Sequence, residues 1–185
     1  MTDDPLPWTF KVSTSEIPDP GLECNLVATA QERAALAAIA GVAAISDLEA
    51  AFDVGPPRLG RIHVTGHVRG VVSQTCVVTL EPLQNRVDED VDVFFAPEEE
   101  AEAARLLSAE SEDLTADPPE PIIGGKIDLG RLAAELFVLG IDPYPRKDGA
   151  QFEPIVAPAD PSEHPFAALA GLKAKADPDP AKGKK

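Results

Sequence analysis

Cysteine and aromatic residues are scarce in this sequence, and both shortages limit what the protein can be. Cys24 and Cys76 are the only two cysteines, too few for the disulfide framework that holds small secreted domains together. Aromatic residues make up 5% of the chain, and much of the apolar content is Ala and Val, so we expect a modest core. The 185 residues still suffice for one domain of ordinary size.

Long apolar segments are also missing. No apolar run approaches the roughly 20 residues that a membrane-spanning helix needs. The segment Met1-Thr2-Asp3-Asp4-Pro5 has neither the basic nor the apolar region of a secretory signal. We therefore expect a cytoplasmic protein with reduced thiols and no membrane partner, in which Cys24 packs as a small buried side chain.

The residue patterns of the common catalytic and metal sites are absent. Thr79 stands where a second cysteine would complete a Cys-x-x-Cys pair with Cys76, so neither a zinc half-site nor a redox pair forms. His63 and His67 are four residues apart on a predicted strand, hence roughly 13 Å apart and unable to share a metal. There is no Gly-x-Ser-x-Gly motif or phosphate-binding loop. The sequence predicts no enzyme, no metal and no cofactor.

The charge is strongly one-sided. Asp and Glu number 32 against 16 Lys and Arg, which gives a formal net charge of −16. Such a chain repels a phosphate backbone, so non-specific nucleic-acid binding is disfavoured. It attracts basic partners, such as ribosomal proteins. The alternative that the acidity serves only solubility stays open.

Two helices have clear start and stop signals. Thr29-Ala30-Gln31-Glu32 is a capping box, and the alanine-rich helix that it opens is expected to run to Ala40 and end at Gly41. Asp128 is the predicted N-cap of a second helix over residues 129–139, which carries leucines at helical spacing and ends at Gly140.

A long β-hairpin is the best-supported element. Residues 61–76 and 83–95 alternate between apolar and charged positions, and the turn lies near residues 77–82. The apolar faces are Ile62, Val64, Val68 and Val72 on the first strand and Val87, Val91, Val93 and Phe95 on the second. Gly66 and Gly70 on the apolar face indicate a bulge or the close approach of another element.

The opposite face of this hairpin carries the one cationic row of the sequence. It consists of Arg61, His63, His67 and Arg69, and the facing row is Asp88, Asp90 and Asp92. The row is a candidate contact for RNA or a partner. The favoured interpretation is mutual pairing of the two rows across the strands.

The remaining segments complete the expected fold. Residues 98–121 are acidic and alanine-rich and are interpreted as a mobile insertion, and residues 173–185 as a disordered tail. We predict a single α+β domain over residues 1–172. Its sheet is mainly antiparallel, with curling toward a barrel as an open possibility, and two helices pack on it.

Several motifs in order along the chain resemble those of one bacterial family. They include Glu32-Arg33-Ala34-Ala35-Leu36, Val64-Thr65-Gly66-His67-Val68, Gln74-Thr75-Cys76-Val77-Val78-Thr79-Leu80-Glu81-Pro82, Phe94-Phe95, Ile127-Asp128-Leu129-Gly130, Ala134-Glu135-Leu136, Asp142-Pro143-Tyr144-Pro145 and His164-Pro165-Phe166-Ala167-Ala168-Leu169. With these motifs the chain resembles the YceD-like large ribosomal RNA subunit accumulation proteins, in their alphaproteobacterial form.

The resemblance implies a structural role for the most specific positions. Its wider pattern at the hairpin turn is Cys-x-Arg-Cys-Leu-x-Pro, from which this chain keeps Cys76, Leu80 and Pro82 but has Val78 and Thr79 at the Arg and second Cys positions. A metal role is therefore not carried over. Cys76 would end a strand, Leu80 would pack and Pro82 would fix the turn. Asp128, Pro143, Tyr144 and Pro145 are the other structural or partner-binding candidates.

The resemblance also implies a process. It predicts a non-enzymatic ribosome-biogenesis factor that supports synthesis, processing or stability of large-subunit ribosomal RNA. Its partners would be precursor ribosomal RNA or large-subunit ribosomal proteins, reached through protein contacts. The alternative is an acidic adaptor or chaperone-like module for a basic ribosomal protein, and direct RNA binding through Arg61 and Arg69 is a third hypothesis.

Overall fold

A computed structural model of the chain describes residues 6–110, 117–152 and 169. Residues 1–150 form one compact unit, and residues 151–185 form a second. Of the second unit only Gln151, Phe152 and Leu169 are described. The predicted domain end at residue 172 and the predicted tail therefore lie outside the described residues.

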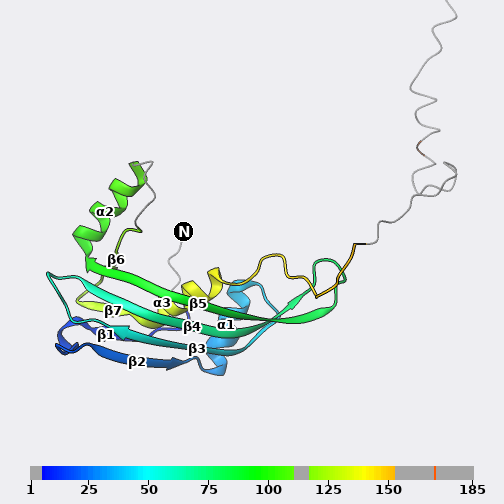
Figure 1. The fold of residues 1–185 in the computed structure, drawn as a ribbon, viewed down its shortest axis with the longest axis horizontal. Helices are drawn as coiled ribbons and strands as arrows, with labels where there is room; N and C mark the ends of the chain where they lie inside the picture. Colours follow the sequence, from blue (N-terminus) through cyan, green and yellow to red (C-terminus); the bar gives the residue numbers. More distant parts are fainter. Residues whose placement is uncertain (1–5, 111–116, 153–168, 170–185) are drawn as a thin grey trace, which may run out of the picture. The chain divides into compact units, whose positions relative to one another are not determined.

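The first unit is a β-sheet covered by helices (Figure 1). Its strands are β1 (Lys11–Ser13), β2 (Leu22–Val27), β3 (Ala44–Val54), β4 (Ile62–Thr75), β5 (Pro82–Pro97), β6 (Glu120–Ile122) and β7 (Lys126–Asp128). Its helices are α1 (Ala30–Ala40), α2 (Glu98–Glu110) and α3 (Leu129–Leu139), with a 3-10 turn η1 (Thr14–Glu16). Strands and helices in one unit make the α+β class that the sequence predicts.

The main sheet has the strand order β2-β3-β4-β5-β6. Its first three pairs are antiparallel and the last, β5 with β6, is parallel. β1 and β7 form a separate two-stranded antiparallel sheet. The prediction of a mainly antiparallel sheet is confirmed.

The β4–β5 hairpin follows the predicted alternation. Ile62, Val64, Val68 and Val72 are each no more than 1% exposed, and Val87, Val91 and Phe95 of β5 are also buried. Val93 is only partly buried. Burial of one face of a ladder fixes its register, because a slip of one residue would turn every apolar side chain outward.

Gly70 marks the close approach that the sequence indicated. The ring of Phe137 on α3 lies against Gly70, and a Cβ there would collide with that ring and with the carbonyl oxygen of Asp47. Phe137 itself has no exposed surface. The glycine thus lets α3 sit directly on β4.

The two predicted helices have the expected ends. The Thr29 side chain accepts the N–H of Glu32, and the Glu32 carboxylate accepts the N–H of Thr29 at 2.7 Å. Gly41 ends α1 with a φ of 67°, which is a left-handed cap. Asp128 caps α3 by accepting the N–H of Arg131 at 3.1 Å. The same carboxylate oxygen accepts the N–H of Phe10 at 2.9 Å, which ties the segment before β1 to α3.

The prediction that the fold contains two helices is wrong, because the acidic stretch 98–121 supplies a third. This stretch contains a third helix, α2, and the strand β6, which extends the main sheet. Ala101 of α2 is 4% exposed, and Glu100 pairs with Arg61. Glu98 and Glu99 lie in the first turn of α2. Their negative charges interact favourably with the positive N-terminal end of the helix dipole. Residues 111–116 are not described, and the predicted mobility of the stretch stays a prediction.

The sheet does not close into a barrel in the described part of the chain, where β2 and β6 are its two edges. β6 and β7 start as a hairpin at a bridge between Ile123 and Lys126. The next hydrogen-bonded position would place Pro121 opposite Asp128, and proline has no N–H to donate. The strands therefore diverge, β6 staying with β5 and β7 pairing with β1.

Candidate functional site

The turn of the β4–β5 hairpin is closed by hydrogen bonds centred on Cys76. The N–H of Cys76 donates to the carbonyl of Glu81 at 2.9 Å, and the N–H of Leu80 donates to the carbonyl of Cys76 at 3.0 Å. The N–H of Thr79 points to the Cys76 sulfur at 3.4 Å. Leu80 takes a left-handed φ of 59°, uncommon for a leucine, which lets this short turn close.

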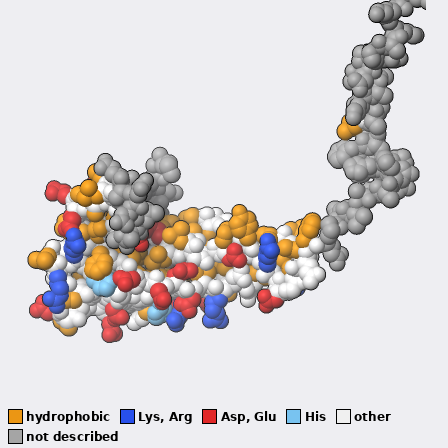
Figure 2. Space-filling model, turned by 45° about the horizontal axis from the view of Figure 1, so that its top comes forward, with side chains coloured by type: hydrophobic (Ala, Val, Ile, Leu, Met, Phe, Trp, Pro, Cys, Tyr) orange, Lys and Arg blue, Asp and Glu red, His pale blue; other side chains and the backbone are white. Residues whose placement is uncertain are grey.

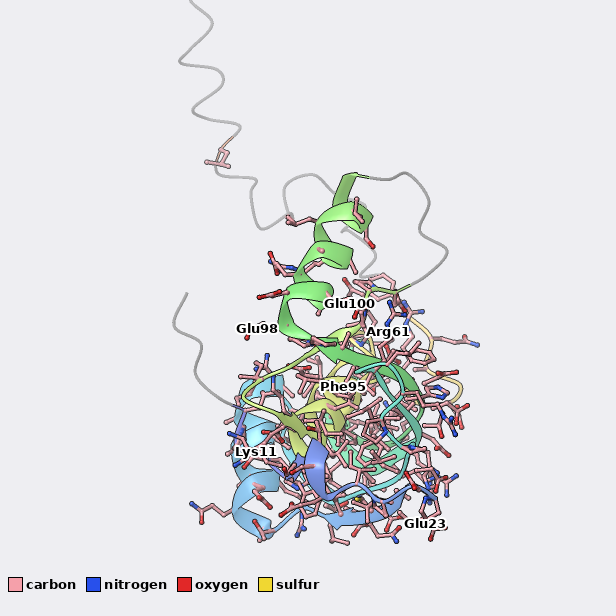
Figure 3. The ribbon with its side chains drawn as sticks, turned by 90° about the vertical axis from the view of Figure 1, so that its left-hand side faces the viewer. Lys11, Glu23, Arg61, Phe95, Glu98 and Glu100 are labelled. Carbon is pink, nitrogen blue, oxygen red and sulfur yellow. The ribbon has the colours of Figure 1, made fainter. Side chains whose placement is uncertain are left out.

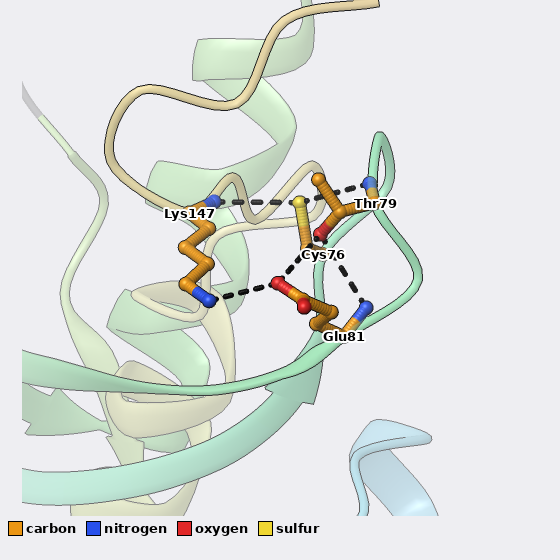
Figure 4. Close-up of polar contacts among 4 residues, drawn as sticks. All are labelled: Cys76, Thr79, Glu81 and Lys147. Atoms are coloured by element: carbon orange, nitrogen blue, oxygen red, sulfur yellow. Dashed lines mark hydrogen bonds and ion pairs between the residues drawn. The ribbon is translucent and has the colours of Figure 1, made fainter.

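A second segment, residues 142–147, lies along this turn. The N–H of Val77 donates to the carbonyl of Pro145 at 2.9 Å. The N–H of Lys147 donates to the Cys76 sulfur at 3.4 Å, and the Lys147 ammonium pairs with Glu81 at 2.8 Å. We call residues 76–81 together with residues 142–147 the clasp (Figure 4). It joins parts of the chain that are about seventy residues apart.

Gln74 supports the clasp from inside. Its side-chain N–H donates to the carbonyl of Asp142 at 2.8 Å, and its side-chain oxygen accepts from Asn85 at 2.9 Å. It is the one buried polar residue of the described part of the chain, at 9% exposure. A buried amide is costly unless it is hydrogen-bonded, and here both ends of the amide have partners.

The hydrogen bonds around the Cys76 sulfur favour the charged form of this side chain. The hydrogen bond from the Thr79 hydroxyl and the N–H groups of Lys147 and Thr79 lower the pKa of Cys76 to about 6, against the opposing effect of burial. Hydrogen bonds to the charged form favour ionisation in this way. Because the single hydroxyl proton of Thr79 can also reach Glu81 at 3.5 Å, the two acceptors share it.

The other charges of the clasp reinforce each other. The Lys147 ammonium lowers the pKa of Glu81. In turn the Glu81 carboxylate, and less strongly the Cys76 sulfur, raises the pKa of Lys147. Cys24, in contrast, is buried in the core, and burial raises the pKa of its thiol. The surroundings of Cys76 therefore favour the thiolate, whereas those of Cys24 favour the neutral thiol.

The chemistry open to Cys76 is narrow. A thiolate is a nucleophile and a metal ligand, but Cys76 has no exposed surface that a substrate can reach. No group of three or more His, Cys, Asp or Glu side chains suited to a metal occurs among the residues that the structure describes. At position 79 the sulfur meets a backbone N–H rather than a second sulfur. The arrangement holds two segments together.

The predicted motif residues lie at the hairpin turn with its clasp, except Asp128, which lies at the start of α3. Cys76 follows the end of β4 and Asp128 caps α3, as expected. Pro82 begins β5 opposite Thr75, and its expected role in fixing the turn stays a prediction. The expected packing of Leu80 is wrong, because its side chain is 77% exposed, directed outward by the left-handed backbone. Pro143, Tyr144 and Pro145 belong to the clasp, where Pro145 is buried and Tyr144 is 72% exposed.

The cationic row of β4 pairs with its neighbours. Arg69 binds Asp88 at 2.9 Å, and His63 binds Asp92 at 2.7 Å. Arg61 reaches Glu100 of α2, and His67 lies opposite Asp90 in the ladder register. The favoured interpretation of pairing across the strands holds for Arg69 and His63. A contact of this row with RNA or a partner stays a prediction.

Two contributors were missed by sequence reasoning. Lys147 lies 71 residues from Cys76, and no local pattern links them. Phe94 stacks on His63 with ring centroids 4.2 Å apart and planes 5° apart. A signal for Phe94 existed, since it is an aromatic residue on the charged face of the strand, directly opposite His63 in the ladder.

Exposed apolar side chains lie at both ends of the hairpin. Val77, Leu80 and Tyr144 are exposed at the clasp, and Leu59 and Phe94 are exposed toward the other end. Figure 2 shows hydrophobic side chains interspersed with acidic and basic ones on this face. Across the described residues, no helix is long and apolar enough to cross a membrane.

Comparison with known proteins gives one match. The family model described as "Large ribosomal RNA subunit accumulation protein YceD" matches residues 64–173, more than half of the chain. The matched region begins in β4 and contains both segments of the clasp, whereas β1–β3 and α1 precede it. No curated protein and no solved structure matches the chain. The chain belongs to the YceD family of large ribosomal RNA subunit accumulation proteins.

Proposed function

We propose that this protein is a non-enzymatic factor of ribosome biogenesis, needed for synthesis, processing or stability of large-subunit ribosomal RNA. The observation that carries the proposal is the family match over residues 64–173, which includes the most specific motifs of the chain. The family's name associates it with large-subunit ribosomal RNA and thus with ribosome biogenesis in general.

The factor acts in the cytoplasm through protein contacts. The net charge of −16 opposes direct approach to a phosphate backbone and favours basic proteins. Arg61 and Arg69, the cations best placed for RNA, are already paired with Glu100 and Asp88. Large-subunit ribosomal proteins, or precursor RNA reached through them, are the partners that this charge distribution supports.

The absence of catalysis is part of the proposal. The one strongly perturbed nucleophile, Cys76, is fully buried, and its hydrogen bonds serve the clasp. Productive catalysis would require substrate access to that sulfur.

Depletion of the protein tests the proposal. Ribosomes from depleted cells are separated on a sucrose gradient, and precursor large-subunit RNA is probed in the same samples. We expect a specific fall in large subunits, with unprocessed or degraded large-subunit RNA, reversed when the wild-type protein is supplied again. Normal subunit ratios and normal large-subunit RNA would contradict the proposal.

A second candidate function is favoured by the acidity alone. An acidic adaptor would hold a basic ribosomal protein before it joins the subunit. Such a complex depends on charge and should dissociate steeply as salt rises, since the Debye length falls from ~10 Å at 0.1 M to ~3 Å at 1 M. Retention of the partner at high salt would exclude a purely electrostatic adaptor.

Direct RNA binding remains the third candidate. It predicts ultraviolet crosslinks on β4, and replacement of both Arg61 and Arg69 by Ala should abolish them. Unchanged crosslinking of that double variant would dismiss this candidate. The observed pairing of both arginines makes it less favoured than the other two.

A further inference from the structure

The gap between the diverging strands β6 and β7 is a hollow of about 460 Å³. Its floor is apolar, made by Phe95, Ile127 and Leu132, which are all at least nine-tenths buried. Hollows of ~300–1,000 Å³ with apolar floors are typical of ligand sites. Figure 3 looks at this end of the molecule and shows Phe95 between Glu98 and Lys11.

One wall of the hollow carries two ammonium groups. Lys11 of β1 and Lys126 of β7 share a face of the small sheet and are diagonal neighbours, since Ser13 is opposite Lys126. Neither side chain has a hydrogen bond or ion pair with any residue that the structure describes. Arg131 on the same side already binds Glu135 at 2.8 Å. Asp128, which lies opposite Lys11 and also lines the hollow, accepts the N–H groups of Phe10 and Arg131. Lys11 and Lys126 thus bring two positive charges to the hollow without an ion pair to any described residue.

The opposite wall carries a carboxylate. Glu120 of β6 makes no hydrogen bond or ion pair with a described residue. Burial against the wall raises its pKa, the charge of Glu135 adds to the rise, and Arg131 opposes it. A cation placed beside Glu120 would relieve this penalty.

Beyond Glu120 a second hollow, of about 790 Å³, continues the surface toward α2. It shares Glu120 and Pro121 with the first and is lined by Glu98, Glu99 and Glu102. Glu102 is paired with Arg105 at 3.1 Å, whereas Glu98 and Glu99 have no ion pair in the described chain. Among the charged groups that have no ion pair to a described residue, the surface therefore runs from Lys11 and Lys126, across the apolar floor, to the carboxylates of Glu120, Glu98 and Glu99.

The edge of β6 restricts how a partner can bind here. Pro119 and Pro121 occupy the positions whose N–H groups would point away from β5, so that edge has no donors there for an added strand. A partner must therefore engage the side chains of the two hollows rather than extend the sheet.

We propose that these two hollows bind the carboxyl-terminal segment of a basic protein. The terminal carboxylate lies between Lys11 and Lys126, and the last apolar side chain rests on the floor at Phe95. Preceding Lys or Arg side chains lie along Glu120, Glu98 and Glu99. The inference rests on the proposed function only in making that partner a large-subunit ribosomal protein.

The charges favour this occupant over two others. An RNA phosphate would suit Lys11 and Lys126 but meet the carboxylates of the second hollow. An internal basic segment would suit the carboxylates but leave both lysines unused. Only a segment with cations and a free carboxylate complements both walls.

The test uses the full chain and a fluorescein-labelled peptide, Gly-Arg-Lys-Arg-Ser-Leu, with either a free or an amidated carboxyl terminus. Binding is followed by anisotropy at about 0.15 M salt, where surface charges are screened beyond ~8 Å. We expect amidation to weaken binding about tenfold, the scale of one lost charge-assisted contact. Non-specific attraction predicts the opposite sign, because amidation makes the peptide more positive.

Substitutions in the two hollows test which residues cause the difference in affinity between the free and the amidated peptide. The double variant Lys11→Gln with Lys126→Gln should bind both peptides equally, because the carboxylate has lost its partners. Arg146→Gln, which removes an exposed cation at the clasp, should preserve the tenfold difference. Glu98→Gln with Glu99→Gln should weaken both peptides, unlike the charge-matched control Glu23→Gln with Asp47→Asn on β2 and β3.

Equal binding of the two peptides to the wild-type chain would overturn the proposal. So would displacement of the peptide by a short single-stranded RNA in a manner that depends on Lys11 and Lys126. Failure of the proposed function would look different. In that case the peptide binds as expected, while depletion leaves large-subunit RNA unchanged.

Discussion

At the hairpin turn, N–H groups from two distant segments meet on the Cys76 sulfur, and every polar atom of the buried Gln74 amide is engaged. At the opposite end of the same strands, β6 and β7 diverge, and Lys11, Lys126 and Glu120 have no ion pair or side-chain hydrogen bond to any residue that the structure describes. One end satisfies its polar groups internally, and the other leaves them for something else. This difference indicates that an unknown partner is to be sought at the end where β6 and β7 diverge.

The clasped end also shows how a charge can be structural. Cys76 is buried, and its charged form is favoured because the Thr79 hydroxyl and backbone N–H groups form hydrogen bonds to it in place of water. The hollow at the other end has charges that water still reaches. A buried, fully hydrogen-bonded charge fixes a conformation, whereas an exposed, unpaired charge is available for recognition.

The largest expected effect comes from a change in the core between the two ends. Phe137→Ala removes the ring that packs on Gly70 and has no exposed surface. Loss of such a buried ring typically costs about 3–5 kcal/mol of the free energy of unfolding, which urea denaturation measures. Leu139→Ala on the same helix is the control, because Leu139 is 80% exposed and its loss should stay within about 0.5 kcal/mol. Similar losses for both would refute this packing.

The next change opens only the clasped end. Cys76→Ala leaves the N–H groups of Thr79 and Lys147 without their acceptor, and unpaired buried donors are destabilising. We expect a lower urea midpoint than wild type and faster amide exchange at Val77 and Lys147, with β6 and β7 unaffected. Unchanged exchange at both amides would show that the sulfur does not hold the clasp.

The pH dependence of the free energy of unfolding tests separately whether the Cys76 sulfur stabilises the clasp. The folded Cys76 thiol has a pKa of about 6 and its ordinary value is 9.0, so the folded state releases this proton more readily than the unfolded state. Stability should therefore rise with pH between about 6 and 9 and be lost as pH falls through 6. Cys76→Ser should lack this rise in urea titrations. An identical rise in both proteins would assign it to other groups.

The smallest expected effect is at the open end. Replacement of residues 98–116 by a short Gly-Ser linker removes α2, whose one strongly buried side chain among those described is Ala101. We expect a loss of roughly 1 kcal/mol, the scale of a buried methyl group, and no change at the clasp. The interpretation of residues 98–121 as an insertion likewise predicts that α2 contributes little to folding. A melting temperature far below that of the parent would contradict it.

Local patterns predicted the parts of the fold that local physics determines. The faces of the hairpin followed from alternation, and the ends of α1 and α3 followed from Thr29, Gly41 and Asp128. The clasp was not predictable, because Lys147 meets Cys76 only in the folded chain. The hollow was not predictable either, because the interpretation of residues 98–121 as a mobile insertion places Pro121 outside the sheet. The missing N–H of Pro121 is what separates β6 from β7.

Hydrogen exchange of the full chain, with and without the free-carboxylate peptide, compares the two ends most directly. In the free protein we expect slow exchange at Val77 and Lys147 and faster exchange in β6 and β7. Added peptide should slow exchange only around β6, β7 and α2. Protection by the peptide at the clasp instead, or at neither end, would contradict the account of a closed end and an open, partner-binding end.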